Sequence, residues 1–272
     1  MKESCIHSLT RLQLYWGTFD YLILIRIFIY HNVFPMNAEF KDILFLDIET
    51  VGCADEYSKL SERLKTQWAR KAGFLKREQG QSDEELFQER AGIYAEFGKI
   101  VVIAMGVYTD NEGGELGLRT KYFAEHDEKK LLADFRNMLE KMGPNTRLCA
   151  HNGKEFDFPY LCRRMLVNNL PLPTVLNVMG KKPWEVGHLD TMEMWKFGDY
   201  KHYTSLDLLL ALFNIPSSKG VMDGSMVSKV YYTEGDLNKI AEYCVGDVVA
   251  IAQLYLKMKG LPIIHPENIV PA

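Results

Sequence analysis

Apolar runs of strand length alternate with segments of helical periodicity along most of this chain, and this alternation constrains its fold more than any other feature. The turn residues Asn, Glu and two Gly at 111–114 predict a hairpin between the second and third strands. Three leading strands followed by alternating helices and strands predict an α/β sandwich with a mixed sheet. The strands are expected at 43–48, 99–108, 117–124 and 146–151, and the helices at 128–142, 156–168, 206–213 and 234–259.

Composition narrows the class of protein further. The chain has 272 residues, 47% of them hydrophobic and 25% charged, which suits one large or two small globular domains. The net charge of −4 argues against a basic nucleic-acid coat protein. It allows an enzyme that holds nucleic acid through bound metal and a local basic strip. Five cysteines without zinc-type spacing predict reduced thiols and a cytoplasmic protein.

The first 35 residues differ from the rest. Their apolar run at 21–30 is half the length of a membrane span and contains Arg26. The features of a signal peptide are also missing. We therefore expect no membrane span, an N-terminal extension over 1–35 and one main domain over 36–272. The extension is either dispensable or upstream of a true start at Met36; a membrane-surface segment and an extra packed strand or helix remain alternatives.

Four acids and one tyrosine stand at chemically meaningful places. Asp47 and Glu49 are two apart near the end of the first strand, so both side chains point to one face. Such a pair repels itself unless a cation joins it, and hard cations prefer oxygen ligands. Asp157 opens a helix, while Tyr243 and Asp247 are one turn apart on the last helix. Each motif alone is commonly a strand end, a helix cap or a surface pair, but chance rarely supplies all three together.

These segments resemble the motifs of the DEDD 3′–5′ exonucleases of the ribonuclease H-like fold, in the subgroup with Tyr in the third motif. FLDIET is similar to the first motif, HNGKEFDFPYL to the second and YCVGD to the third. The other subgroup carries His where this chain has Glu242. Segments 195–227 and 231–257 resemble predicted stand-alone exonucleases related to the proofreading domain of family-B DNA polymerases. The likeness covers roughly residues 40–260.

The resemblance implies a three-layer fold, with a mixed sheet flanked by helices, and an active site. Asp47, Glu49, Asp157 and Asp247 would hold two divalent cations, Mg²⁺ or Mn²⁺, with Asp47 bridging both. Two ions clamp the attacking and leaving oxygens of a phosphoryl displacement. Tyr243 would orient the attacking water or help to deprotonate it.

The resemblance also implies a substrate. We expect hydrolysis from the 3′ end of a single strand, with release of nucleoside 5′-monophosphates. DNA is favoured because the likeness is to polymerase proofreading domains, and a DNA polymerase or repair protein is a possible partner. Two alternatives stay open: a ribonuclease D-like exoribonuclease, and a catalytically silent nucleic-acid-binding or polymerase-partner module on the same fold.

Other residues are candidates for contact with the strand. Residues 56–97 read as a helical or partly mobile insertion. Its stretch 63–77 combines basic residues with two aromatics, which suits phosphate contact and base stacking but also a solvated helix face. Asp190 is expected to cap the helix from Thr191, and His151 to be a structural hydrogen-bonding residue. The basic stretch comprises Arg63, Lys65, Arg70, Lys71, Lys76 and Arg77, with Trp68 and Phe74. The residues that we expect to contact the nucleic-acid strand are Asn152, Phe156, Lys71, Lys181, Lys182 and Trp184.

Overall fold

The computed structural model describes residues 38–272 apart from 112–113, 200–202 and 218–221. The extension 1–35 and the start at Met36 therefore lie outside the described residues.

A six-stranded mixed sheet forms the centre of the molecule, with the strand order β5-β4-β1-β2-β3-β6. Strand β2 runs antiparallel to both β1 and β3, whereas β1, β4 and β5 are mutually parallel. The strands are β1 (Ile43–Gly52), β2 (Gly98–Asp110), β3 (Leu116–Ala124), β4 (Arg147–Ala150), β5 (Leu189–Asp190) and β6 (Ile269–Pro271). The predicted α/β class, mixed sheet and hairpin are confirmed.

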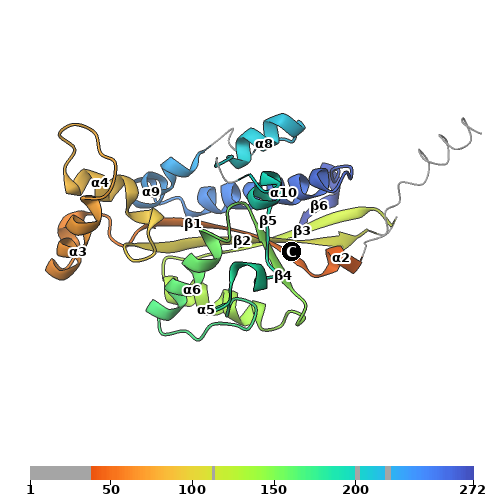
Figure 1. Cartoon of the computed structure of the whole chain (residues 1–272), viewed down its shortest axis with the longest axis horizontal. Helices are drawn as coiled ribbons and strands as arrows, with labels where there is room; N and C mark the ends of the chain where they lie inside the picture. Colours follow the sequence, from red (N-terminus) through yellow and green to blue (C-terminus); the bar gives the residue numbers. More distant parts are fainter. Residues whose placement is uncertain (1–37, 112–113, 200–202, 218–221) are drawn as a thin grey trace, which may run out of the picture.

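Helices cover both faces of this sheet. The long α10 packs on β1, β2 and β3 from one side, and α5 and α6 pack on the other (Figure 1). The helices are α2 (Ala38–Lys41), α3 (Glu62–Ala72), α4 (Asp83–Arg90), α5 (Glu128–Leu139), α6 (Asp157–Val167), α7 (Thr191–Lys196), α8 (Leu206–Phe213), α9 (Val227–Lys229) and α10 (Leu237–Met258). Side chains alternate along β1, so its odd-numbered residues face α10 and its even-numbered ones face α5 and α6. Phe45 and Ile48 accordingly belong to opposite cores.

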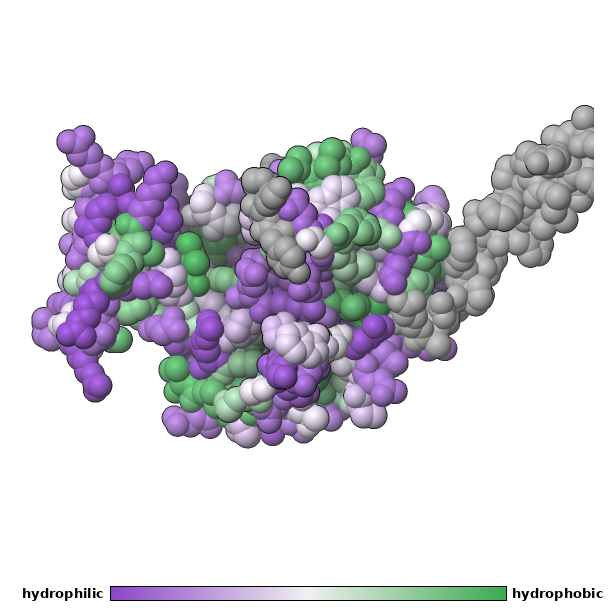
Figure 2. Space-filling model, in the orientation of Figure 1, coloured by the Kyte–Doolittle hydropathy of each residue, from purple (hydrophilic) through white to green (hydrophobic). Residues whose placement is uncertain are grey.

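Helices α3 and α4 form a separate lobe, residues 56–97, beyond the end of β1 (Figure 1). The lobe has its own small core around Trp68, Leu86 and Phe87. Its surface is largely hydrophilic in the view of Figure 2. The predicted helical insertion is confirmed.

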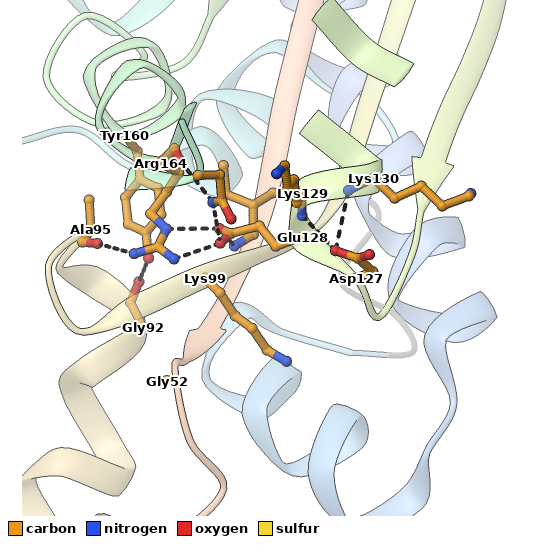
Figure 3. Close-up of polar contacts among 12 residues, drawn as sticks. Gly52, Gly92, Ala95, Lys99, Asp127, Glu128, Lys129, Lys130, Tyr160 and Arg164 are labelled. Atoms are coloured by element: carbon orange, nitrogen blue, oxygen red, sulfur yellow. Dashed lines mark hydrogen bonds and ion pairs between the residues drawn. The ribbon is translucent and has the colours of Figure 1, made fainter. Parts of the chain in front are cut away.

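A buried polar network joins the lobe to the main domain (Figure 3). Arg164 of α6 makes a two-pronged ion pair with Glu128 of α5, with Nε–Oε1 and Nη2–Oε2 distances of 2.8 and 2.6 Å. Its Nη1 donates to the carbonyl of Ala95 in the lobe. The carbonyl of Gly92 accepts from Tyr160 of α6 at 2.8 Å. The lobe is thus fastened to α6, the helix that begins with Asp157.

Some boundaries differ from those expected. Strand β1 runs four residues past 48 because its pairing with β2 continues through an irregularity at Glu49/Thr50. Helix α10 starts at Leu237 because Gly235 has φ 70° and Asp236 caps the helix, and a π-helix occupies Val230–Glu234. Strand β6 is only three residues long, too short to give a periodic signal.

Candidate active site

Strand β1 places two acids on the face that α10 covers. Asp47 and Glu49 lie on the odd-numbered side of the strand, whereas Ile48 between them packs in the opposite core. Glu49 is 8% exposed and Asp47 is half-buried. The predicted shared face follows from the two-residue period of a strand.

Helix α10 brings three further groups to the same face. The Sγ atom of Cys244 lies 3.2 Å from Oδ2 of Asp47. One ligand atom each from Asp47, Glu49 and Cys244 lies within 4.8 Å of the others. Tyr243 is buried, and its phenol is hydrogen-bonded to Asp247 one turn further on.

The turn after β4 supplies the fourth acid. Because β4 lies beside β1 and runs parallel to it, the segment after β4 meets the second half of β1. Asp157, the first residue of α6, is 3% exposed. Backbone N–H groups of Asp157 itself and of Ile48 in β1 hydrogen-bond its carboxylate. Asp157 is thereby tied directly to the strand that carries Asp47 and Glu49.

Asp190 and His151 hold this turn in shape. The Asp190 carboxylate accepts from the backbone N–H groups of Asn152 and Lys154 at 3.0 and 3.1 Å. It also accepts from Met192, capping α7 as predicted. The ring of His151 bridges Thr191 Oγ1 and the carbonyl of Thr204, at 2.9 and 2.8 Å, as expected of a structural histidine.

Burial and mutual repulsion raise the pKa values of the acids in the cluster. Burial, and then the charges of Asp157, Glu49 and Asp247, raise the pKa of Asp47 well above its ordinary value. Burial, and then Asp247 and Asp157, do the same to the pKa of Glu49. Burial raises the pKa of Asp157 to about 7, partly opposed by its backbone hydrogen bonds. Burial and the Asp247 charge raise the pKa of the Tyr243 phenol.

This donor set fits a hard divalent cation. Carboxylates that raise one another's pKa values are held together at a cost, which a bound cation would remove. Oxygen-rich sites of this kind suit Mg²⁺ or Mn²⁺. Cys244 adds one softer sulfur beside the oxygens of Asp47 and Glu49.

A cavity of about 250 Å³ opens onto the acids. Asp47, Tyr243 and Asp247 line one side of it. Tyr203, shortly before α8, and Asp207, in the first turn of α8, also line it. Sequence reasoning assigned no role to these two residues or to Cys244. The signal for Cys244 was its spacing of four from both Ile240 and Val248, which places it on the buried helix face.

Two of the predicted strand contacts lie beside the acids. Asn152 has a left-handed backbone with φ 64°, and among the described residues its buried Oδ1 has no hydrogen-bond partner. Phe156, half-buried, immediately precedes Asp157 and packs on Tyr160 with ring centroids 5.3 Å apart. Both residues therefore belong to the turn that presents Asp157.

The second basic loop lies elsewhere. Lys181 lines a cavity with Arg147 and His188 at the start of β4, whereas the acids gather beyond the other end of that strand. Lys182 Nζ lies 5.3 Å from the ring centroid of Trp184, which is 77% exposed. The structure does not bring Lys181, Lys182 and Trp184 together with the acids.

The residues of the basic stretch differ in their exposure to solvent. Trp68 is completely buried in the lobe core, so the hypothesis that it stacks on bases is wrong. Phe74 is 89% exposed. Lys71 Nζ lies 4.1 Å from the ring centroid of Tyr94. Exposed positions on α3 carry Arg63 and Arg70, seven residues apart and thus on one face.

The fold is an α/β domain, and the acids of β1, α6 and α10 gather into one carboxylate cluster, an arrangement typical of nucleases. The chain belongs to the family of predicted 3′–5′ exonucleases related to the exonuclease domain of PolB, whose model matches residues 93–262. This confirms the resemblance to exonucleases related to the PolB exonuclease domain that the sequence motifs indicated. The matched range contains Asp157, Tyr243 and Asp247, whereas Asp47 and Glu49 precede it.

Three solved structures are weakly similar to this chain. The family B DNA polymerase of the archaeon Pyrobaculum calidifontis is 18% identical, with a TM-score of 0.45 over 80% of this chain and 24% of the polymerase. Exonuclease I is 14% identical, with a TM-score of 0.34 over 79% and 40% of the two chains. The RNase domain of yeast Pop2 is 9% identical, with a TM-score of 0.35 over 93% and 86%.

The chain thus spans about a quarter of the polymerase that it matches. No curated protein matches the sequence. Among the described helices, none combines the length and apolar composition needed to cross a membrane.

Proposed function

We propose that this protein is a divalent-cation-dependent 3′–5′ exonuclease that acts on single-stranded nucleic acid, with DNA favoured, and releases nucleoside 5′-monophosphates. The observation that carries the proposal is the convergence of four acids whose charges act on one another, two of which line one cavity. The four are Asp47, Glu49, Asp157 and Asp247, and Asp47 and Asp247 line the cavity. Carboxylates alone would repel a phosphodiester. A cluster of this kind can act on one only when cations over-neutralise it.

Each acid has a distinct place in the proposed site. Asp47 has ligand atoms of Glu49 and Cys244 within 4.8 Å, and the charges of the other three acids act on it, which suits a ligand shared by two ions. Asp157 and Asp247 approach from α6 and α10. Two bound cations would stabilise the attacking and leaving oxygens of an in-line displacement.

Tyr243 is proposed to orient the attacking water. Its phenol is hydrogen-bonded to Asp247, and its pKa lies above the ordinary value, so it stays protonated at neutral pH. A phenol that donates its proton to Asp247 can still accept a hydrogen bond from a water and fix it, but it cannot remove a proton from that water. Of the two roles expected from the sequence, orientation is therefore the better supported.

The strand is proposed to reach the acids past the turn after β4. Asn152 offers an unpartnered buried oxygen there, and Phe156 adds an apolar surface. Arg63 and Arg70 on α3 would contact phosphates further along, with Lys71 beside them. Lys181, Lys182 and Trp184 could touch only a longer strand that follows the molecule to the start of β4.

DNA is favoured over RNA because the family is related to the exonuclease domain of PolB. The same relationship suggests work beside a DNA polymerase or a repair protein. The four described cysteines are free thiols, as a cytoplasmic protein would keep them.

The test is degradation of matched strands. Purified protein is incubated with a 5′-labelled single-stranded DNA and its RNA counterpart, with Mg²⁺, with Mn²⁺ and with EDTA. We expect a ladder that shortens from the 3′ end, needs the cation and yields nucleoside 5′-monophosphates. Asp157→Ala should abolish it.

The controls separate the alternatives. Glu155→Gln, an exposed acid two residues from Asp157, should retain activity. Preferential loss of the RNA strand would favour the exoribonuclease. Binding of either strand without cleavage, in folded protein with cation present, would favour the silent nucleic-acid-binding module.

A further inference from the structure

An exposed tyrosine, to which the sequence analysis gave no role, lines the cavity beside the acids. Tyr203 lines this cavity together with Asp47 and Asp247. The residue as a whole is 68% exposed. Large aromatic side chains usually bury their apolar area, so a tyrosine left open beside a charged site is informative.

The backbone that carries Tyr203 is fixed on its C-terminal side. The carbonyl of Thr204 is hydrogen-bonded to the His151 ring, which is held in turn by Thr191. Ser205 then caps α8 by accepting from Leu208 N–H. The ring is therefore presented by the same His151 that follows β4, and its position is coupled to that of the acid-bearing turn.

Tyr203 shares its cavity with two of the acids, Asp47 and Asp247. Partial burial of the phenol, and then the charge of Asp157, raise its pKa above the ordinary value. Because Tyr203 lines the cavity and most of the residue is exposed, apolar surface of its ring is available at the cavity mouth. A flat apolar surface beside the reacting phosphate is where the terminal base of a bound strand would lie.

We propose that Tyr203 is the stacking platform for the base of the 3′-terminal nucleotide. The inference rests on the proposed function and names how that site grips its substrate. Every base has a π-face, so stacking holds a strand without reading its sequence. Tyr203 would thus let the acids process successive nucleotides of any identity.

The consequence is a defined pattern of kinetic loss. Removing one base–aromatic stack weakens binding by about 5- to 150-fold. Tyr203→Ala should therefore raise KM by a factor in this range and change kcat much less. Tyr203→Phe keeps the ring and should behave like the wild type.

The decisive comparison uses two strands that differ only at the 3′ end. One ends in a normal nucleotide and the other in a stable abasic residue. If the ring holds the base, Tyr203→Ala raises KM for the normal end but leaves KM for the abasic end at the wild-type value. Tyr122→Ala serves as the control, because Tyr122 is 45% exposed on β3 and lines a different cavity.

A binding measurement keeps this proposal separate from the proposed activity. Single strands with 2-aminopurine at the 3′ end are titrated with Asp157→Ala protein, with or without Tyr203→Ala, in Mg²⁺. Stacking on Tyr203 quenches the fluorescence, and the quench disappears in the double variant. This readout needs no cleavage, so it holds even if the wild type proves catalytically silent.

Three outcomes would overturn the inference. Equal losses on the normal and abasic ends would show that Tyr203 supports the fold of the site rather than the base. A Tyr203→Phe variant as impaired as Tyr203→Ala would assign the effect to the hydroxyl. An unchanged 2-aminopurine quench in the double variant would place the terminal base elsewhere.

Discussion

The thiol of Cys244 donates a hydrogen bond to the carboxylate of Asp47, with 3.2 Å between Sγ and Oδ2. Sγ also lies 3.4 Å from the backbone oxygen of Asp47. Cys244 is fully buried between α10 and β1. The contact lowers the pKa of Asp47 against several effects that raise it, so the thiol favours the ionised form that a cation needs.

Replacing Cys244 should therefore weaken cation binding. Cys244→Ala removes the donor, and we expect Mn²⁺ affinity to fall by about tenfold, as when other ligand-supporting partners are lost. Cys244→Ser keeps a donor and should lose much less. Titration calorimetry or Mn²⁺ electron paramagnetic resonance measures this directly.

The control for lost volume is Cys149→Ala, at another fully buried cysteine. It should lower stability by about 1 kcal/mol and leave cation affinity unchanged. Equal weakening by Cys244→Ala and Cys244→Ser would assign the effect to packing instead.

Asp157→Asn should stabilise the cation-free protein while abolishing activity. Burial raises the folded-state pKa of Asp157 to about 7, above its unfolded value near 4. Its favourable contribution is therefore complete below about pH 4 and is lost as the pH rises through about 7. At pH 8 in EDTA the variant should exceed the wild type by up to about 4 kcal/mol in free energy of unfolding, and the difference should shrink towards pH 4.

Urea unfolding at both pH values measures this difference. Saturating Mg²⁺ should narrow the gap, because it binds the folded wild type far better than the variant. Glu155→Gln should show no such pH dependence. A variant less stable than the wild type at pH 8 would contradict the argument.

The sequence predicted most of the sheet and helices because their periods are local properties of the chain. It also predicted which of the candidate residues share a face. Asp47 and Glu49 are two apart on a strand, and Tyr243 and Asp247 are four apart on a helix, so each pair points to one side. Asp157 lies near the acids of β1 only because β4 pairs in parallel with β1, and the α/β pattern of the sequence predicts such pairing.

The remaining site residues depend on tertiary packing. Tyr203 and Asp207 reach the acids only because α8 packs on α10, a contact that no local pattern encodes. Trp68 was misread because basic neighbours suggested a stacking residue. Its spacing of four from Ala72, also buried, marks the inner face of α3 and is the better signal.

Breaking the ion pair between Arg164 and Glu128 should be strongly destabilising. Both side chains are at most 10% exposed, and Arg164→Met would leave the Glu128 carboxylate buried without its partner (Figure 3). The expected loss is about 3–5 kcal/mol in free energy of unfolding. The control is Lys239→Met, which removes a partly exposed pair with Glu234 and should cost at most about 1 kcal/mol. A loss below that of the control would mean that water replaces the arginine.

Two arginines of α3 should contribute to strand binding through phosphate contacts. Each phosphate contact on a single strand contributes about 0.7 to the slope of log affinity against log salt. Arg63→Gln combined with Arg70→Gln should therefore reduce that slope by up to about 1.4. Fluorescence anisotropy with Asp157→Ala protein avoids degradation of the probe. The control is Arg119→Gln, at an exposed position of β3, which should leave the slope unchanged. An unchanged slope in the double variant would show that α3 faces away from the bound strand.

Gly153 should tolerate no side chain, because it lies in the turn that presents Asp157. A Cβ there would lie 2.4 Å from Ala150 Cβ and 3.0 Å from the Phe158 ring. Neither neighbour is the free end of a flexible chain, so the turn itself must shift. Gly153→Ala should lose at least tenfold in kcat, since a displacement of about 1 Å at a catalytic group can cost 100-fold.

The matched control is Gly143→Ala, where a Cβ meets nothing within 4 Å. It should keep its activity and change stability by no more than about 0.5 kcal/mol. Circular dichroism separates a shifted turn from an unfolded protein. Wild-type kcat in folded Gly153→Ala would show that Asp157 does not depend on this turn for its position.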